Sequence, residues 1–196
     1  MIGIIFPNQL ISHFQNPLAD EDIEFLILIE DPIFYGFRKK IKMYFNTIKL
    51  TYHQLSINHW SETEAPKFNS QFDIIPYNDF KPSIYKKLAR KFKSAVVMET
   101  VDHELNEKLL AAFGDNLKII PTPNFIASRE FLDSFNSITT GAKYLHASFY
   151  QRMRVANDIL LTKEGKPMGG KWSYDAENRK VPSKGIAIPR TSGYNE

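Results

Sequence analysis

Side chains suited to binding a planar ligand follow directly after three short apolar runs of the sequence. The runs are residues 2–6, 24–29 and 95–98. If they are parallel strands, their carboxyl ends lie at one edge of a sheet, where open α/β sheets bind ligands. Amides, carboxylates and aromatic rings that meet there suit a planar, hydrogen-bonding heterocycle. The candidate cofactor-binding residues are Phe6, Asn8, Gln9, Leu10, Glu30, Asp31, Tyr35 and Glu99.

Other kinds of site have weaker support in the residue types. A Gly-x-Gly-x-x-Gly fingerprint and a P-loop are both missing, which argues against a ligand held by its phosphates. The histidines are scattered, and Asp102-His103-Glu104 is typical of a helix start, where acidic residues favour the positive end of the dipole. A metal site there, and an acid–base pair of Glu99 and Asp102, remain alternatives. The serines have no visible base partner, so we assign no catalytic residue.

A second distinctive stretch is residues 169–180, Gly-Gly-Lys-Trp-Ser-Tyr-Asp-Ala-Glu-Asn-Arg-Lys. Two glycines allow a sharp turn, and the two aromatic side chains that follow offer large faces for burial. Charged and amide side chains around them suit a hydrogen-bonded junction between two bodies. A loop fixed only by its aromatics is the alternative. The candidate partner or interdomain contacts, which include two arginines from the preceding helix, are Arg152, Arg154, Trp172, Tyr174, Asp175, Glu177, Asn178 and Arg179.

Strands and helices alternate in the first two thirds of the chain. Further strand candidates are residues 72–75 and 117–121, and helices are expected from Pro82 and from Asp102 to Phe113, with Gly114 as its C-cap. Such alternation predicts an α/β fold, a doubly wound, Rossmann-like parallel sheet of five strands flanked by helices. A C-terminal helix and an extended tail should follow it. We expect an α/β domain at 1–123 and a connector at 124–196.

Apolar residues at helical spacing predict a helix from Phe37 to about Leu55 with one buried face, followed by a loop from Trp60 to Ser70. After residue 123, Ser128 should cap a short helix that runs through Phe135. A connector is expected at 136–141, and a longer helix at 144–161. The apolar stripe of the first of these helices consists of Phe37, Ile41, Phe45, Ile48, Tyr52 and Leu55.

The composition is that of an ordinary globular protein, with 43% hydrophobic and 24% charged residues among 196. Without cysteine, the chain has no disulfide, no thiolate-zinc site and no cysteine-ligated iron–sulfur cluster. We expect a soluble, cytoplasmic protein, because no apolar stretch approaches membrane-spanning length and no signal peptide opens the chain. Basic residues gather near the end, at Lys163, Lys166, Lys171, Arg179, Lys180, Lys184 and Arg190.

Several motifs of this sequence resemble the photolyase-related branch of the cryptochrome/photolyase family, the branch of bacterial (6-4) photolyases with an iron–sulfur cluster. The motifs are Phe149-Tyr150, Arg152-x-Arg154, Gly165-x-Pro167-x-Gly169-Gly170 and Trp172-x-x-Asp175-x-Glu177-Asn178-Arg179. They stand in the family's order at the end of its N-terminal α/β domain. Gln9-Leu10, residues 30–41 and residues 123–135 extend the resemblance over essentially the whole chain.

The resemblance implies an antenna domain whose crevice holds a 6,7-dimethyl-8-ribityllumazine. Asn8 departs from the family, which has aspartate before Gln9-Leu10, and this change removes a carboxylate. The chain ends where the family's large helical domain should begin. That domain carries the FAD, the [4Fe-4S] cluster and the lesion-binding surface, so none of these is expected here. The implied protein is a truncated or split-gene product that does not repair DNA alone and contacts DNA only indirectly.

The implied partner is a separately encoded FAD-binding helical domain, with a homodimer as the other possibility. A non-enzymatic nucleic-acid or protein interaction module that uses the basic C-terminal segment is the alternative function. A degenerate remnant without a ligand and an independent small enzyme are two further alternatives. Salt-dependent binding to DNA would distinguish the interaction module, because phosphate contacts release counterions.

Overall fold

A computed structural model describes residues 1–138, 146–176, 178–181 and 183–187 of the chain. By their internal contacts the residues divide into two compact units, Met1–Ile126 and Ala127–Glu196. We call them the N-terminal and the C-terminal unit and describe each by itself. In the part of the chain that the structure describes, no helix is long and apolar enough to cross a membrane.

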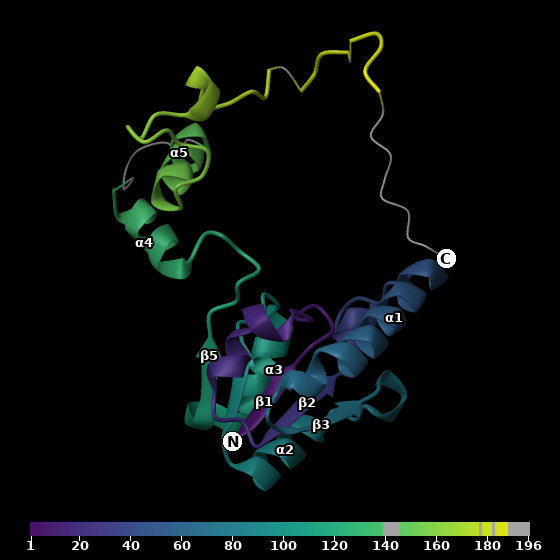
Figure 1. Cartoon of the computed structure of the whole chain (residues 1–196). Coiled ribbons are helices and arrows are strands. Elements are labelled where there is room, and N and C mark those ends of the chain that lie inside the picture. The colour runs from purple at the N-terminus through teal and green to yellow at the C-terminus, as the bar shows by residue number, and fades with distance from the viewer. Residues whose placement is uncertain (139–145, 177, 182, 188–196) are drawn as a thin grey trace. The chain divides into compact units, whose positions relative to one another are not determined.

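The N-terminal unit contains a five-stranded, entirely parallel sheet with the strand order β3-β2-β1-β4-β5 (Figure 1). The order reverses between β1 and β4, which makes the fold a doubly wound, Rossmann-like α/β domain, as the sequence predicted. Each predicted strand forms within one or two residues of its expected position. The strands are β1 (Ile2–Ile5), β2 (Phe25–Ile29), β3 (Gln71–Ile75), β4 (Ala95–Met98) and β5 (Leu117–Ile120).

Helices cover both faces of this sheet because alternate residues of the central strands point to opposite faces. On one face, Ile27 and Ile29 of β2 belong to a core that includes residues of α2 (Ile84–Phe92) and α3 (His103–Phe113). On the other face, Leu26 and Leu28 share a core with residues of α1 (Thr47–Thr63). A strand buried on both faces reads as a continuous apolar run, and β1, β2 and β4 have this pattern.

The helix start predicted at Asp102-His103-Glu104 is confirmed. The Asp102 carboxylate accepts a hydrogen bond from the Leu105 amide at 3.2 Å, as an N-cap should, and α3 ends at Phe113 before Gly114. Among the described residues, no group of three or more His, Asp or Glu side chains could hold a metal ion.

The helix predicted from Phe37 to Leu55 is wrong in its start, its end and its buried face. Residues 37–42 form an antiparallel bridge between Phe37 and Lys42, and α1 begins only at Thr47, after its N-cap Asn46. It continues to Thr63, so Trp60 is helical and buried, not part of a loop. Gly36, with φ of 89°, makes the turn, and a side chain there would collide with the carbonyl of Met43.

The described part of the C-terminal unit includes the α-helices α4 (Arg129–Ile138) and α5 (His146–Ala156). The Ser128 hydroxyl accepts a hydrogen bond from the Phe131 amide at 3.1 Å, which confirms the predicted cap. Phe149 of α5 packs edge-on against Phe131 and Phe135 of α4. The predicted connector is wrong for 136–138, which are helical, and its remainder lies outside the described residues. The predicted helix 144–161 is too long at its C-terminal end, because α5 stops at Ala156.

Asp31 is fully buried at the carboxyl end of β2, where it binds groups from three other elements. Its carboxylate accepts hydrogen bonds from the Tyr85 hydroxyl of α2 at 2.7 Å and from the Lys108 ammonium of α3 at 2.9 and 3.1 Å. The Ile33 amide donates to it as well, at 3.0 Å, and so caps the short 3-10 helix Pro32–Tyr35. Asp31 therefore fixes the segment after β2 against both helices of that face.

Replacing Lys108 by methionine should destabilise the N-terminal unit strongly. The substitution leaves the Asp31 charge buried without a cation, and such a loss costs about 3–5 kcal/mol. Chemical denaturation followed by circular dichroism measures the change. Lys39→Met is the matched control, because Lys39 forms an exposed ion pair, at 3.4 Å, with Glu107, the residue before Lys108 in α3. That variant should lose less than about 1 kcal/mol; equal losses in the two variants would contradict the role given to Asp31.

Candidate functional site

The point where strand order reverses is occupied by the protein's own Gln9. This side chain is 1% exposed, and its amide nitrogen donates to the carbonyl oxygens of Met98 at 3.0 Å and Glu99 at 3.5 Å. Its amide oxygen accepts from the Phe6 amide at 3.2 Å. Gln9 thus joins the carboxyl ends of β1 and β4 and uses both ends of its amide in doing so.

The other residues predicted around this point lie in different environments. Phe6 is fully buried and stacks on Phe34, with ring centroids 5.8 Å apart. Asn8 is exposed, while Leu10 packs against the core on the α1 face. Glu99 is half-buried, and its backbone amide donates to Ile120 at 2.7 Å.

A pocket of about 320 Å³ lies instead at the carboxyl ends of β2 and β3. It contains two of the predicted cofactor-binding residues, Glu30 and Tyr35. Glu30 and its neighbour Asp31 separate here, because successive residues of a strand point to opposite faces. Glu30 goes to the α1 face and Asp31 to the α2–α3 face. The pocket is lined by Glu30, Tyr35, Phe37, Leu50, Gln54, Pro76, Tyr77 and Asn78, and we call it the aromatic pocket.

Three aromatic rings form one wall of the aromatic pocket. The Tyr35 and Tyr77 ring centroids are 4.7 Å apart at an interplanar angle of 40°, and Phe37 lies 6.0 Å from Tyr77. Glu30 is 3% exposed, and one of its carboxylate oxygens accepts from the Tyr77 amide at 2.8 Å. This hydrogen bond connects the end of β2 to the residues after β3 and sets the spacing of the two tyrosines.

The Tyr35 hydroxyl is buried and has no hydrogen bond of regular geometry, although Glu30 lies beside it. Burial, and next the neighbouring Glu30, raise the pKa of Tyr35 above its usual range, so the phenol stays protonated. A protonated hydroxyl held only by a hydrogen bond of irregular geometry is a donor that can turn to an acceptor atom of a ligand. Phe37, Tyr77 and Asn78 were missed from the sequence as site residues. The reasoning applied to the ends of the first two strands, extended to the end of the third, would have identified Tyr77 and Asn78.

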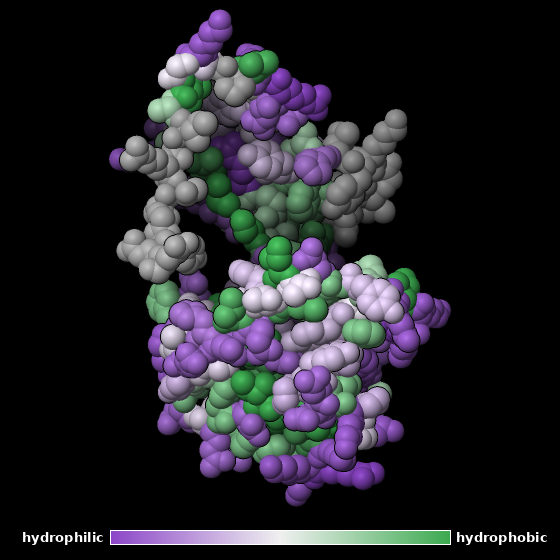
Figure 2. Space-filling view, turned by 90° about the vertical axis from the view of Figure 1, so that its right-hand side faces the viewer, coloured by the Kyte–Doolittle hydropathy of each residue, from purple (hydrophilic) through white to green (hydrophobic). Residues whose placement is uncertain are grey.

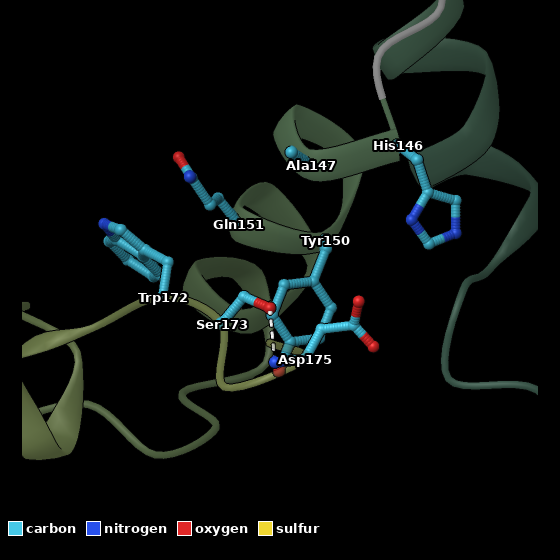
Figure 3. A pocket seen from close by; sticks show the side chains of 7 residues that line it. All are labelled: His146, Ala147, Tyr150, Gln151, Trp172, Ser173 and Asp175. Atoms are coloured by element: carbon cyan, nitrogen blue, oxygen red, sulfur yellow. Dashed lines mark hydrogen bonds between the residues drawn. The ribbon is translucent and has the colours of Figure 1, made fainter. Parts of the chain in front are cut away.

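A second pocket, of about 400 Å³, lies within the C-terminal unit. Figure 3 shows that it lies between α5 and the segment that contains Trp172. The Ser173 hydroxyl in its wall accepts a hydrogen bond from the Asp175 amide at 3.2 Å. The pocket is lined by His146, Ala147, Tyr150 and Gln151 of α5 and by Trp172, Ser173 and Asp175. We call it the α5 groove.

Arg154 holds this groove together from inside the unit. It is 5% exposed, and its guanidinium donates to the carbonyl oxygens of Ile159 at 3.1 Å, Leu160 at 2.5 Å and Trp172 at 3.0 Å. The same group lies 5.2 Å from the Trp172 ring and 5.7 Å from the Tyr150 ring. Arg154 therefore connects the C-terminal end of α5 to residue 172 by hydrogen bonds and cation–π contacts.

The remaining predicted contact residues lie at the surface around the groove. Arg152 is exposed, with its guanidinium 5.2 Å from the Phe135 ring. The Tyr174 hydroxyl donates to the Gly169 carbonyl at 2.7 Å, and it stands where a side chain at Gly169 would be. Arg179 approaches Asp175 at 3.7 Å, and the Asn178 amide donates to the Asp175 carbonyl at 3.2 Å. Glu177 lies outside the described residues.

Comparison with known proteins identifies the family. Residues 3–196 match the model of a family described as deoxyribodipyrimidine photo-lyase-related protein. This chain belongs to the photolyase-related protein family. A relative from Acanthamoeba polyphaga mimivirus, described as uncharacterized protein R852, is 31% identical over 195 residues. The match covers 93% of this photolyase-related protein and 96% of the viral one.

In this photolyase-related protein, replacing Arg154 by methionine should loosen the Trp172 segment. The change removes three hydrogen bonds from a buried cation, and local stability should fall by about 3 kcal/mol. Iodide quenching of tryptophan fluorescence, measured in a Trp60→Phe background so that only Trp172 emits, should increase. Arg152→Met removes an exposed arginine of the same helix and should leave quenching unchanged. Unaltered quenching in the Arg154 variant would exclude the proposed connection.

His53, whose ring lies 6.2 Å from that of Tyr35, should make stability depend on pH. Burial, and next Lys49, lower the pKa of His53 below 6.5, with Glu30 opposing them. The unfolded chain then takes up a proton near pH 6.5, and the folded protein does so only at lower pH. The contribution of His53 to stability should therefore fall as pH decreases from about 6.5 to the lower pKa of the folded protein. Below that pKa it should be constant.

Denaturation with urea at pH 7.5 and at pH 5.5 tests this expectation. His53→Gln should reduce the loss of stability between the two pH values. His103→Gln, which removes an exposed histidine of α3, should leave the loss as in the unmodified protein. A His53 variant with an undiminished pH dependence would show that other groups cause it.

Proposed function

We propose that this photolyase-related protein binds a planar heterocyclic chromophore, of the ribityllumazine type, in the aromatic pocket. The observation that carries the proposal is the buried Tyr35 hydroxyl without a regular hydrogen bond, in a wall of three aromatic rings. Aromatic faces stack on a flat ring system, and the protonated phenol donates to a carbonyl or ring-nitrogen acceptor. The volume of about 320 Å³ lies in the range of small-molecule sites.

The remaining lining groups also match a lumazine. Such a ring has carbonyl acceptors, an imide N–H donor and a chain of hydroxyl groups. The Glu30 carboxylate accepts N–H donors, and the amide side chains of Gln54 and Asn78 supply both donors and acceptors at the edge of the pocket. When bound, a lumazine supplies absorption of near-ultraviolet and blue light. The protein's own residues bind it, orient it and keep water from one of its faces.

We further propose that the protein is the antenna-type part of a light-responsive flavoprotein and that a separately encoded helical chain carries FAD and the iron–sulfur cluster. The 196 residues include no cysteine, so a cysteine-ligated cluster would have to be carried outside them. The α5 groove is the proposed contact with that chain. It presents Tyr150 and Trp172, and such aromatic side chains are enriched at protein interfaces.

Binding of 6,7-dimethyl-8-ribityllumazine should be measurable by fluorescence titration of the purified protein. Tyr35→Phe removes only the hydroxyl donor and should weaken binding about tenfold, because the ligand acceptor loses its partner. Tyr77→Ala removes a stacking face and should weaken binding further. Tyr44→Phe is the control, since Tyr44 is 89% exposed and does not line the pocket. No binding by the unmodified protein would refute the chromophore proposal.

Mixing the protein with a helical, flavin-binding chain of the same family tests the proposed partner separately. A heterodimer should form at micromolar concentration and should be weakened by Trp172→Ala. Binding that is independent of Trp172 would contradict the assignment to the α5 groove, and no binding would contradict the partner.

Interaction with nucleic acid is the second candidate function. The observation in its favour is that six basic residues of the C-terminal unit are all exposed. If it is correct, affinity for DNA should fall steeply with salt, and charge reversal at Lys171 and Lys180 should reduce that slope. The six are Lys163, Lys166, Lys171, Arg179, Lys180 and Lys184.

A further inference from the structure

Helix α1 has large apolar side chains on two faces, although the N-terminal unit covers only one of them. Ile57 and Trp60 point into the core and are 0% and 3% exposed. Ile48, Tyr52 and Leu55 are 78%, 71% and 61% exposed. At 3.6 residues per turn the two sets lie roughly 150° apart around the helix. The apolar stripe that the sequence predicted to be the buried face is therefore the outer one.

The outer residues have the spacing of a helix–helix seam. Ile48, Tyr52 and Leu55 are separated by four and then three residues, which is the alternation of the core positions of a coiled coil. His59 and Glu62, both exposed, continue the same alternation toward the end of the helix. Figure 2 views the side on which α1 lies in Figure 1, and hydrophobic side chains are visible there among hydrophilic ones. A soluble protein usually covers such a seam.

We propose that a second copy of this chain covers the seam, with the two α1 helices packed antiparallel about a twofold axis. In this register Tyr52 of each copy packs against Leu55 of the other, and Ile48 packs against His59. In an antiparallel helix pair with twofold symmetry, the numbers of two facing residues always add to the same total. Both pairs meet this condition, so they belong to one register. The same surface then serves both copies, and no additional partner is needed.

Charge complementarity favours a second copy in this orientation. The same register brings Glu62 of one copy level with the start of α1 in the other, where the Lys49 ammonium lies 3.7 Å from the centre of the Phe45 ring. The carboxylate of each copy thus meets the ammonium of the other, twice in the dimer. Parallel helices in register would instead bring the two Glu62 carboxylates, both on the seam, against each other. The side chains that flank the seam, Thr51, Ser56, Asn58 and Thr63, are uncharged and repel nothing.

Disulfide trapping tests the register sharply, because the chain has no cysteine of its own. Ile48→Cys and His59→Cys are made in separate proteins, both at exposed positions. Under mild oxidation the mixture should give a covalent dimer, because antiparallel packing places these two positions side by side. Either protein alone should form no covalent dimer, since identical positions are then 11 residues, or about 16 Å, apart along the axis. A disulfide requires α-carbons within about 7 Å.

Each other outcome overturns the proposal. Cross-linking of the Ile48→Cys protein with itself would show parallel helices, and no cross-linking in any mixture would show that α1 does not pair with a second copy. Sedimentation velocity of the cysteine-free protein gives an independent measurement. Dimerisation should depend on concentration, and Leu55→Lys should weaken it about tenfold or more, because a charge then enters the seam.

Phe14→Lys is the matched control, since Phe14 is 90% exposed and lies outside α1. It should leave dimerisation unchanged, and circular dichroism should show both variants folded. A cysteine-free protein that stays monomeric at all concentrations, or one whose dimer is insensitive to Leu55→Lys, would refute the proposal. Neither result would affect chromophore binding, because the seam residues do not line the aromatic pocket.

Discussion

The buried carboxylate of Asp31 is the interaction on which the arrangement of the N-terminal unit depends. One side chain at the end of β2 receives hydrogen bonds from α2, from α3 and from the turn that follows the strand. A carboxylate without solvent is unfavourable unless each oxygen has donors, so these contacts must form together. Because the turn Pro32–Tyr35 is thereby fixed, Tyr35 reaches the opposite face of the sheet in a defined position. The geometry of the aromatic pocket thus follows from an ion pair that does not line it.

The point of strand reversal is bridged by a side chain of the protein itself. In doubly wound sheets a ligand normally enters the crevice at this point. Here the side-chain amide of Gln9 donates to carbonyl groups at the end of β4 and accepts from the Phe6 amide after β1. The hollow with aromatic walls and a buried donor lies at the next strand pair, β2 and β3. A sheet edge with parallel strand ends offers several such positions, and the side chains decide which one stays open.

The C-terminal unit is organised by a cation instead of a carboxylate. Arg154 satisfies carbonyl groups after the end of α5 and holds Trp172 against the helix, so the same residue ends one element and positions the next. Gly169 has a related role, because the Tyr174 hydroxyl occupies the place of a side chain at this position. These contacts explain why the segment is rich in aromatic, basic and glycine residues. Many of these residues stabilise the conformation of the segment itself, and the proposed partner contacts its outer surface.

The sequence alone determined the elements that depend on neighbouring residues. Apolar runs specified the five strands, Asp102 and Ser128 specified helix starts, and the alternation of elements specified the parallel sheet, because strand and helix periodicities and caps are local properties. It also placed Glu30 and Tyr35 at a strand end. Only the tertiary structure decided which face of α1 is buried, because both faces are apolar and the sheet covers one. It likewise decided that Gln9 connects the ends of β1 and β4. Its acceptors on Met98 and Glu99 lie 89 and 90 residues away, and no local sequence pattern indicates a contact over that separation.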